Sequence, residues 1–370
     1  MKKLFLLSAI LSLCTYAAFA ADTIKIGLLA PITGSYASEG QGMKQVLELL
    51  AADVNAKGGI LGKQVAVITE DDGSDPRTAA LAANKLISQG VVAVIGTYGS
   101  SVTEPTQGIL DESGIVQIAN GATAIRLTEK GLKMFFRTCP RDDEQAKVAA
   151  QTIAKLGYKK IAILHDNSTY AKGLAEETRG LLQKQPGAQI VFFDALTPGE
   201  RDYSTILTKL KQAQPQVVFF TGYYNEAGLL LRQKKEMGFN VPFIGGDATN
   251  NTDLVKIAGV PAAAGFYFIS APLPQDLPTA KAFIDQFKKK YGSEPNSIYP
   301  VLAGDGFNVV VAALKGTKGG NSAQVGAYLH NNLKDFQGLT GKISFNAKGD
   351  RVGEVYKAYK VDAAGKFIMQ

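Results

Sequence analysis

The stretch VIGTYGSSVTEP, residues 94–105, places two glycines and two adjacent serines between an apolar segment and a run that suits a helix. This order predicts a strand, a short polar loop and a helix N-terminus, whose free N–H groups and dipole attract anions. The anion could be a nucleotide phosphate, the oxyanion of a reaction or a plain carboxylate. Ser100 lies where such an anion would be bound, although a serine there could also simply cap the helix.

The sequence signatures of the first two anions are missing. The loop has neither the lysine and hydroxyl of G-x-x-x-x-G-K-[ST] nor the spacing of G-x-G-x-x-G. The chain also lacks the G-x-S-x-G elbow of many hydrolases, and His165 belongs to the other half of the sequence. A nucleophilic Ser100 would need a histidine beside it, so we interpret the site as non-enzymatic. A hydrolase that acts through Ser100 stays an alternative, which turnover of a bound ligand would reveal.

Composition argues against a metal, a cofactor and nucleic acid. The two histidines, His165 and His330, have no cysteine or carboxylate partners at ligand spacing. The formal charge is +7, but the basic residues are scattered in pairs such as Lys159-Lys160 and do not interleave with aromatic residues. We therefore expect no cofactor, no metal and no nucleic-acid partner.

The first twenty residues predict a secretory signal peptide. A lysine pair precedes an apolar run over residues 4–13, and an A-x-A cleavage motif occupies residues 18–20. The bulky leucine before Cys14 fits a lipoprotein signal poorly, so we expect a soluble protein exported to the periplasm. Once the signal is removed, Cys139 is the one cysteine left, which we expect to be a buried, inert thiol without a disulfide.

The rest of the chain predicts two α/β lobes. A length of 370 residues suggests two domains. Near-continuous apolar strands alternate with helical patterns from residue 24, and the alternation restarts after Arg141, as in parallel sheets with helices on both faces. Ligands of such sheets bind at the carboxyl ends of the strands. Four polar loops follow predicted strands and would line a cleft between the lobes: residues 96–100, 120–123, 221–225 and 246–249.

The C-terminal third is expected to connect the lobes. A proline-rich segment at residues 271–278 predicts an extended crossover, followed by helices around residues 280–291 and 304–315. Strands at residues 343–345 and 355–361 would form a hairpin. Several connections of this kind act as a hinge that allows closure about a ligand. The predicted division is residues 22–139 with 271–337 for the first lobe, and 140–270 with 338–370 for the second.

An ordered series of motifs resembles the periplasmic branched-chain amino-acid-binding proteins, which are substrate receptors of ABC importers. The motifs are IKIG at 24–27, DVNAKGGI at 53–60, EDD at 70–72, DP at 75–76, FRT at 136–138, HD at 165–166 and DYS at 202–204. The resemblance extends from residue 24 to the C-terminal strands. It implies the type I periplasmic binding protein, or Venus-flytrap, fold: two Rossmann-like lobes with parallel sheets, joined by a multi-strand hinge and closing around one amino acid.

The resemblance also implies how the ends of the ligand are bound. The α-carboxylate would contact Ser100 and Thr123, and the ammonium would meet the backbone around Gly121 and Ala122 and the carboxylate of Asp247. The chemistry agrees, because a buried zwitterion needs donors for its carboxylate and acceptors for its ammonium.

Tyrosines would complete the site. The resemblance places Tyr170 and Tyr223 over the ligand and Tyr98 beside its side chain, and Glu39 and Tyr299 lie near the expected edges of the cleft.

The sequence departs from the leucine/isoleucine/valine-binding members at three places. Those members carry a glutamate where Asp247 stands, a small aliphatic residue where Tyr98 stands, and a disulfide at the positions of Ser74 and Gly99. The first two departures change the ammonium subsite and the side-chain pocket, so the identity of the amino acid stays open.

We expect an exported, monomeric receptor that captures a branched-chain or related amino acid and delivers it to the membrane permease of an ABC importer. The alternative is a sensor of the same fold that reports a small amide or amino acid to a signalling partner. Neighbouring permease and ATPase genes would favour the receptor, whereas a kinase or antiterminator gene would favour the sensor.

Overall fold

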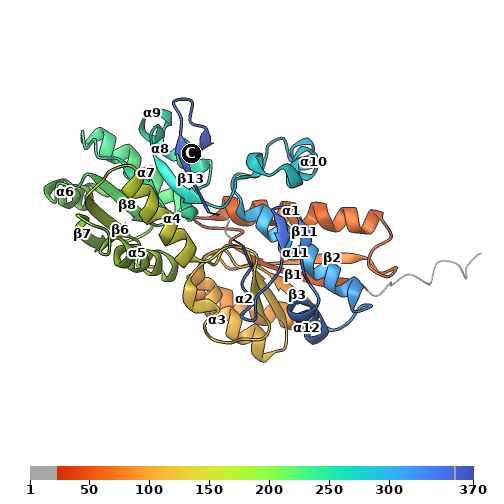
Figure 1. Cartoon of the computed structure of the whole chain (residues 1–370). Helices are drawn as coiled ribbons and strands as arrows, with labels where there is room; N and C mark the ends of the chain where they lie inside the picture. Colours follow the sequence, from red (N-terminus) through yellow and green to blue (C-terminus); the bar gives the residue numbers. More distant parts are fainter. Residues whose placement is uncertain (1–22, 354–355) are drawn as a thin grey trace, which may run out of the picture.

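Two α/β lobes lie next to one another in the computed structural model, which describes residues 23–353 and 356–370 (Figure 1). The predicted signal peptide, residues 1–20, lies outside the described residues. Over the described residues, no helix is long and apolar enough to cross a membrane.

The first lobe is built on a five-stranded parallel sheet in the order β2-β1-β3-β4-β5. Its central strands are buried, β1 from Ile26 onward and β3 and β4 throughout, since helices cover both faces, which explains their apolar sequences. The strands are β1 (Ile24–Ala30), β2 (Val65–Asp71), β3 (Ala93–Ile95), β4 (Val116–Ala119) and β5 (Phe135–Arg137). The helices between them are α1 (Ala37–Ala56), α2 (Pro76–Ser88) and α3 (Ser100–Glu112).

The second lobe contains a seven-stranded sheet in the order β14-β13-β10-β9-β8-β6-β7. Five strands are parallel, and β13 and β14 join them antiparallel at one edge. The strands are β6 (Lys160–His165), β7 (Gln189–Ala195), β8 (Val217–Thr221), β9 (Phe243–Gly245), β10 (Tyr267–Ser270), β13 (Lys357–Val361) and β14 (Phe367–Met369). The helices are α4 (Asp142–Lys155), α5 (Thr169–Leu182), α6 (Ser204–Gln212), α7 (Tyr224–Glu236), α8 (Asp253–Ala258) and α9 (Val260–Ala263).

After β10 the chain returns to the first lobe. There α11 packs along α1, and nearly all of its residues are buried. The elements of this return are α10 (Lys281–Tyr291), α11 (Tyr299–Gly316), α12 (Ser322–Asn331), β11 (Phe336–Gly338) and β12 (Gly341–Ile343). The lobes are thus connected three times, after β5, after β10 and between β12 and β13, as a hinge requires.

Two predicted features of the C-terminal third differ in the structure. The predicted hairpin is wrong: the strand that ends at Ile343 pairs with β11, and β13 pairs with β10 and β14. A tight turn does occur at residues 346–350, but it is flanked by one bridge between Phe345 and Arg351. Local turn residues predict a reversal of the chain and cannot specify which strands pair.

The predicted lobe boundary at residues 337/338 falls inside the β11–β12 hairpin. Asp305 of α11 accepts hydrogen bonds from the backbone of Leu339 (2.5 Å) and Thr340 (3.1 Å), which ties this hairpin to the first lobe. We therefore propose that the final return to the second lobe begins after β12.

Candidate functional site

The loop between β3 and α3 presents the helix N-terminus expected from the sequence. Gly99 occupies the position before the helix with φ of +98°, so Ser100 is the first helical residue and not its cap. Ser100 is fully buried, and its Oγ accepts a hydrogen bond from Ala124 N at 3.2 Å. The side chain of Ser100 therefore joins two of the predicted loops at a point where helix N–H groups also converge.

Backbone contacts hold these two loops together. Gly99 N donates to Gly121 O at 2.7 Å, and Tyr98 and Gly121 form a β-bridge. A Cβ at Gly121 would lie 2.7 Å from the Tyr98 ring and 3.1 Å from the Tyr299 ring, so glycine is the residue that fits there. Ala122 follows, fully buried.

A buried arginine fixes the loop that carries Thr123. Arg137 of β5 donates through Nη1 to the carbonyls of Ala122 (3.1 Å) and Ala124 (2.9 Å), and through Nε to Asp350 Oδ1 (2.6 Å). These bonds surround Thr123, which is 2% exposed. The FRT motif thus has a structural explanation: its arginine positions the first lobe's second loop.

Asp247 belongs to the second lobe and follows the end of β9. The residue is 3% exposed; its Oδ2 accepts from Tyr356 Oη at 3.0 Å, and its backbone N donates to Gln145 Oε1 at 2.8 Å. Its second oxygen, Oδ1, has no hydrogen-bond partner among the described residues. Burial raises the pKa of this carboxyl, while the hydroxyls of Tyr170 and Tyr356 act in the opposite direction.

The predicted tyrosines meet at the interface of the lobes. Tyr98 of the first lobe lies 5.8 Å from Tyr223 of the second, and Tyr223 lies 5.6 Å from Tyr170, measured between ring centroids. Tyr299, at the start of α11, packs edge-on against Tyr98 at 4.9 Å. Tyr36, which the sequence analysis did not identify, stacks on Tyr223 at 4.5 Å. The structure therefore brings all the predicted aromatic residues into one cluster.

The hydroxyl of Tyr98 has an unusual environment. Tyr98 is 2% exposed, yet its Oη has no hydrogen-bond partner within the described residues. An unsatisfied buried hydroxyl is costly, so a ligand group that bonds to it would be favoured. The ring of Tyr98 packs against those of Tyr223 and Tyr299.

Glu39 joins the lobes at the rim of this cluster. It belongs to α1 of the first lobe and accepts hydrogen bonds from Asn251 Nδ2 of the second lobe (2.7 Å) and Ser297 Oγ (2.6 Å). Burial raises the pKa of the Glu39 carboxyl from 4.5 to about 7. Its neighbour Ser38 contacts Tyr224 Oη at 3.0 Å, so the start of α1 is bonded to the opposite lobe at two points.

Other side chains that could be reactive or bind a metal have local roles. His165 Nδ1 accepts from Asn167 N at 3.1 Å, its ring packs on Phe193, and burial lowers its pKa. Cys139 is buried, which raises the pKa of its thiol to about 12. In the part of the chain that the structure describes, no group of three or more His, Cys, Asp or Glu residues could hold a metal ion.

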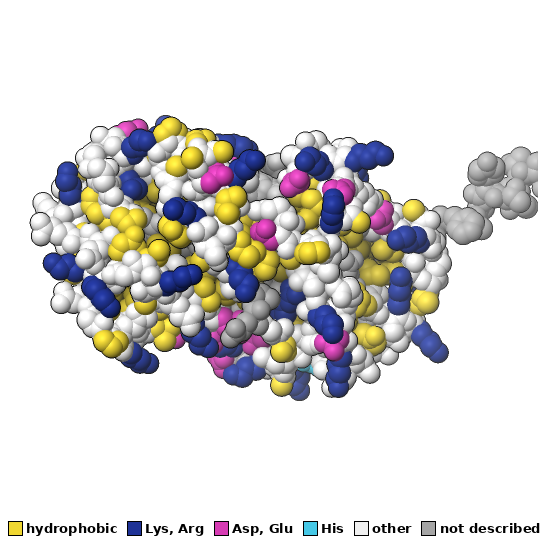
Figure 2. Space-filling view, turned by 45° about the horizontal axis from the view of Figure 1, so that its top comes forward, with side chains coloured by type: hydrophobic (Ala, Val, Ile, Leu, Met, Phe, Trp, Pro, Cys, Tyr) yellow, Lys and Arg dark blue, Asp and Glu magenta, His cyan; other side chains and the backbone are white. Residues whose placement is uncertain are grey.

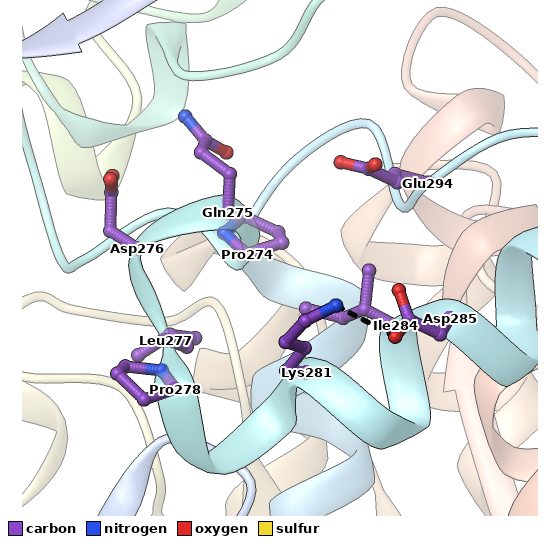
Figure 3. Close-up of a pocket in the computed structure, with 9 residues that line it drawn as sticks. All are labelled: Pro274, Gln275, Asp276, Leu277, Pro278, Lys281, Ile284, Asp285 and Glu294. Carbon is purple, nitrogen blue, oxygen red and sulfur yellow. Dashed lines mark hydrogen bonds and ion pairs between the residues drawn. The ribbon is translucent and has the colours of Figure 1, made fainter.

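The surface carries scattered basic side chains and a hollow away from these residues. In Figure 2 the Lys and Arg side chains are spread over both lobes of the face shown, with uncharged surface between them. A hollow of about 530 Å³ lies in the segment between β10 and α10, where Lys281 forms an ion pair with Asp285 at 2.8 Å (Figure 3). None of the predicted site residues lines it.

Sequence reasoning missed four residues around the cluster: Tyr36, Asp142, Gln145 and Tyr356. No local pattern marks Tyr356, which reaches Asp247 across 109 residues. Asp142 fits the pattern of an ordinary acid in the first turn of a helix, and its burial cannot be read from its neighbours.

Comparison with known proteins supports the same interpretation. Residues 23–366 match the family of periplasmic binding proteins. The chain is 35% identical over 354 residues to the Leu/Ile/Val-binding protein BraC3 of Rhizobium johnstonii, with 95% of each chain covered. It is also 35% identical over 352 residues to a leucine-, isoleucine-, valine-, threonine-, and alanine-binding protein of Pseudomonas aeruginosa, covering 95% of this chain and 92% of that one.

A solved structure agrees with these relatives. The branched-chain amino acid transporter substrate-binding protein LivJ from Streptococcus pneumoniae, in complex with isoleucine, matches with a TM-score of 0.85 at 34% identity. The match covers 94% of this chain and 100% of that one. The predicted resemblance and the predicted type I fold are thus confirmed. With two α/β lobes, a family match over residues 23–366 and relatives of matching length, the chain belongs to the periplasmic binding protein family.

Proposed function

We propose that this protein is an extracytoplasmic receptor that captures one amino acid between its lobes and delivers it to an ABC importer. The observation that carries the proposal is the placement of opposite chemistries on the two lobes. The first lobe offers Ser100 at a helix N-terminus, and the second offers Asp247 with an unpartnered carboxylate oxygen.

Each end of an α-amino acid has a suitable partner. The N-terminus of α3, Ser100 and Thr123 would hold the carboxylate, because helix N–H groups and hydroxyls are donors. Asp247 and the carbonyls near Gly121 and Ala122 would hold the ammonium, because they are acceptors. Tyr98, Tyr170 and Tyr223 would then cover the ligand and exclude water.

The side chain of the ligand is expected to be small and at least partly apolar. Isoleucine is bound in the LivJ structure, and the names of the relatives mention leucine, isoleucine, valine, threonine and alanine. Tyrosine rings provide apolar contact area for such side chains. The unpartnered hydroxyl of Tyr98 favours a member of this group that carries a hydrogen-bonding side chain.

Ligand binding would favour the closed arrangement of the lobes. A ligand shifts a conformational equilibrium by its difference in affinity for the two states, and a zwitterion contacts both lobes in the closed state alone. We propose further that residues 1–20 direct export to the periplasm, that the receptor acts as a monomer, and that it catalyses no reaction.

A thermal-shift screen of the twenty amino acids tests the proposal. A ligand at one hundred times its Kd should add about 2.7 kcal/mol to stability. Asp247→Asn should weaken binding of the best amino acid by about 2–5 kcal/mol, because a buried ammonium loses its counter-charge. Asp253→Asn, on the same lobe but partly exposed, is the matched control. No shift with any amino acid, or equal affinity of the Asp247→Asn protein, would overturn the assignment.

A further inference from the structure

Two buried carboxyl groups are neighbours in the second lobe, and Asp247 is only one of them. Asp142, the first residue of α4, is 1% exposed. One side chain joins the two: Gln145 Nε2 donates to Asp142 Oδ1 at 3.0 Å, and Gln145 Oε1 accepts from Asp247 N at 2.8 Å. Because all three residues belong to the second lobe, the pair stays together when the lobes move.

A helix-capping role leaves the burial of Asp142 unexplained. Acids stabilise the first turn of a helix at its surface, and α4 has two others, Asp143 and Glu144, which are partly exposed. Asp143 is paired with Arg141 at 3.1 Å. Asp142 differs from both, because it is buried and its Oδ2 has no hydrogen-bond partner among the described residues, although the nearby hydroxyl of Thr123 acts to lower the pKa of this carboxyl. Burial of a carboxylate oxygen without a partner is costly unless a ligand supplies one.

The surroundings of the pair supply little positive charge. Arg137 acts electrostatically on Asp142, but its guanidinium is bonded to Asp350 and to backbone carbonyls. The other titratable groups that act on the pair are neutral or negative at neutral pH: Asp143, Cys139, Tyr170, Tyr223, Tyr299 and Tyr356. Burial, followed by the charge of Asp247, raises the pKa of Asp142 well above its ordinary value.

We propose that Asp142 is a second specificity-determining acid, which shares one proton with Asp247 in the ligand-free protein and loses that proton when the ligand's ammonium binds. Two neighbouring buried carboxyls do not readily ionise together, so the pair retains a proton. The bound R–NH₃⁺ replaces it: one positive charge enters, one H⁺ leaves to solvent, and no covalent bond of the ligand changes. The inference rests on the proposed function, because it concerns the ammonium subsite.

The proposal gives Asp142→Asn a signature that a structural role would not produce. At low pH, where the wild-type pair holds its proton, both proteins present one negative charge and should bind with similar affinity. As the pH rises through the raised pKa of Asp142, the wild type approaches two negative charges. Its affinity should then exceed that of the variant by about tenfold. The Kd of Asp142→Asn divided by the Kd of the wild type therefore rises with pH.

Isothermal titration calorimetry in buffers of different ionisation enthalpy measures both affinity and proton release. The probe is the amino acid that gives the largest thermal shift of the twenty. All proteins carry Glu39→Gln, which removes a second acid that titrates near neutral pH, and Asp253→Asn, a partly exposed acid of the same lobe, is the control. We expect proton release with Asp142 present, less release in Asp142→Asn, and no change in Asp253→Asn.

The outcomes separate this inference from the proposed function. A Kd ratio that is constant between pH 5.5 and 8.5, or equal proton release with and without Asp142, would refute the shared proton of Asp142 and Asp247. The proposed function as an amino-acid receptor would still stand. Absence of binding by any amino acid would overturn the proposed function and the pair with it. If Asp142→Asn does not fold, proton release can still be measured on the protein that retains Asp142. No proton release on ligand binding at either pH 5.5 or pH 8.5 would contradict a shared proton.

Discussion

Replacing Glu39 by glutamine should stabilise the ligand-free protein, and the gain should grow with pH. The carboxylate of Glu39 is fully buried between the lobes and accepts hydrogen bonds from Asn251 and Ser297. Glutamine has the same shape, its oxygen can accept from Asn251, and its amide can donate to the hydroxyl of Ser297. The substitution therefore removes the titration while keeping the contacts.

The size of the effect follows from the pKa of Glu39. Burial raises this pKa from 4.5 to about 7, so the folded protein keeps a proton that the unfolded chain releases. The stability that protonated Glu39 contributes is complete below about pH 4.5 and is lost as the pH rises through 7. At about 1.36 kcal/mol per pKa unit, the loss amounts to about 3 kcal/mol. Asp253, the other charged residue that acts on Glu39, is unchanged in the variant.

Urea unfolding at several pH values between about 4.5 and 8 measures the effect. Circular dichroism and tyrosine fluorescence should be followed together, because coincident transitions justify a two-state treatment of a two-lobed protein. The free energy of unfolding of Glu39→Gln should match that of the wild type near pH 4.5 and exceed it by about 3 kcal/mol at pH 8. Glu48→Gln, on the same helix but half-exposed, should show no such divergence. Parallel pH profiles for Glu39→Gln and the wild type would refute a protonated, buried Glu39.

Two further predictions concern the ligand subsites. Ser100→Ala should weaken amino-acid binding by about 1–3 kcal/mol, since a donor and the contact to Ala124 N are lost while helix N–H groups remain. Ser113→Ala at the other end of α3 is its control, and an equally tight Ser100→Ala protein would remove Ser100 from the site. Tyr98→Phe should leave stability unchanged or raise it by up to about 1 kcal/mol, because the lost hydroxyl has no partner among the described residues. Its ratio of leucine to threonine affinity should rise in calorimetry, and an unchanged ratio would show that the hydroxyl does not contact the ligand.

The sequence was informative where structure depends on local pattern. The alternation of apolar strands and helices predicted both parallel sheets, and the four polar loops after strands β3, β4, β8 and β9 do line one interface. Positions with a motif, such as Ser100 and Asp247, could be named in advance. The pairing of the C-terminal strands could not be predicted. β13 pairs with β10, which is far away in the sequence, and turn residues carry no information about such a distant partner.

The missed residues share a physical reason. Gln145 meets Asp247 across 102 residues, and Tyr356 meets it across 109. Contacts at such separations form when the second lobe folds and when the final return of the chain is in place. A single glutamine or tyrosine carries no sign of either event. Burial also decides their chemistry, since Asp142 and Asp143 are the same residue type with different environments.

The division of charge between the lobes explains why an α-amino acid, in the proposed function, would drive closure better than either of its halves. The first lobe contributes donors, namely the N-terminus of α3 and the hydroxyl of Ser100. The second contributes acceptors, the carboxyls of Asp142 and Asp247. A simple carboxylate would contact the first lobe alone, and a simple amine would contact both lobes through fewer groups, so each would gain less than a zwitterion by bringing the lobes together. A zwitterion gains contacts on both sides in the closed state, and that difference in affinity is the free energy available for closure.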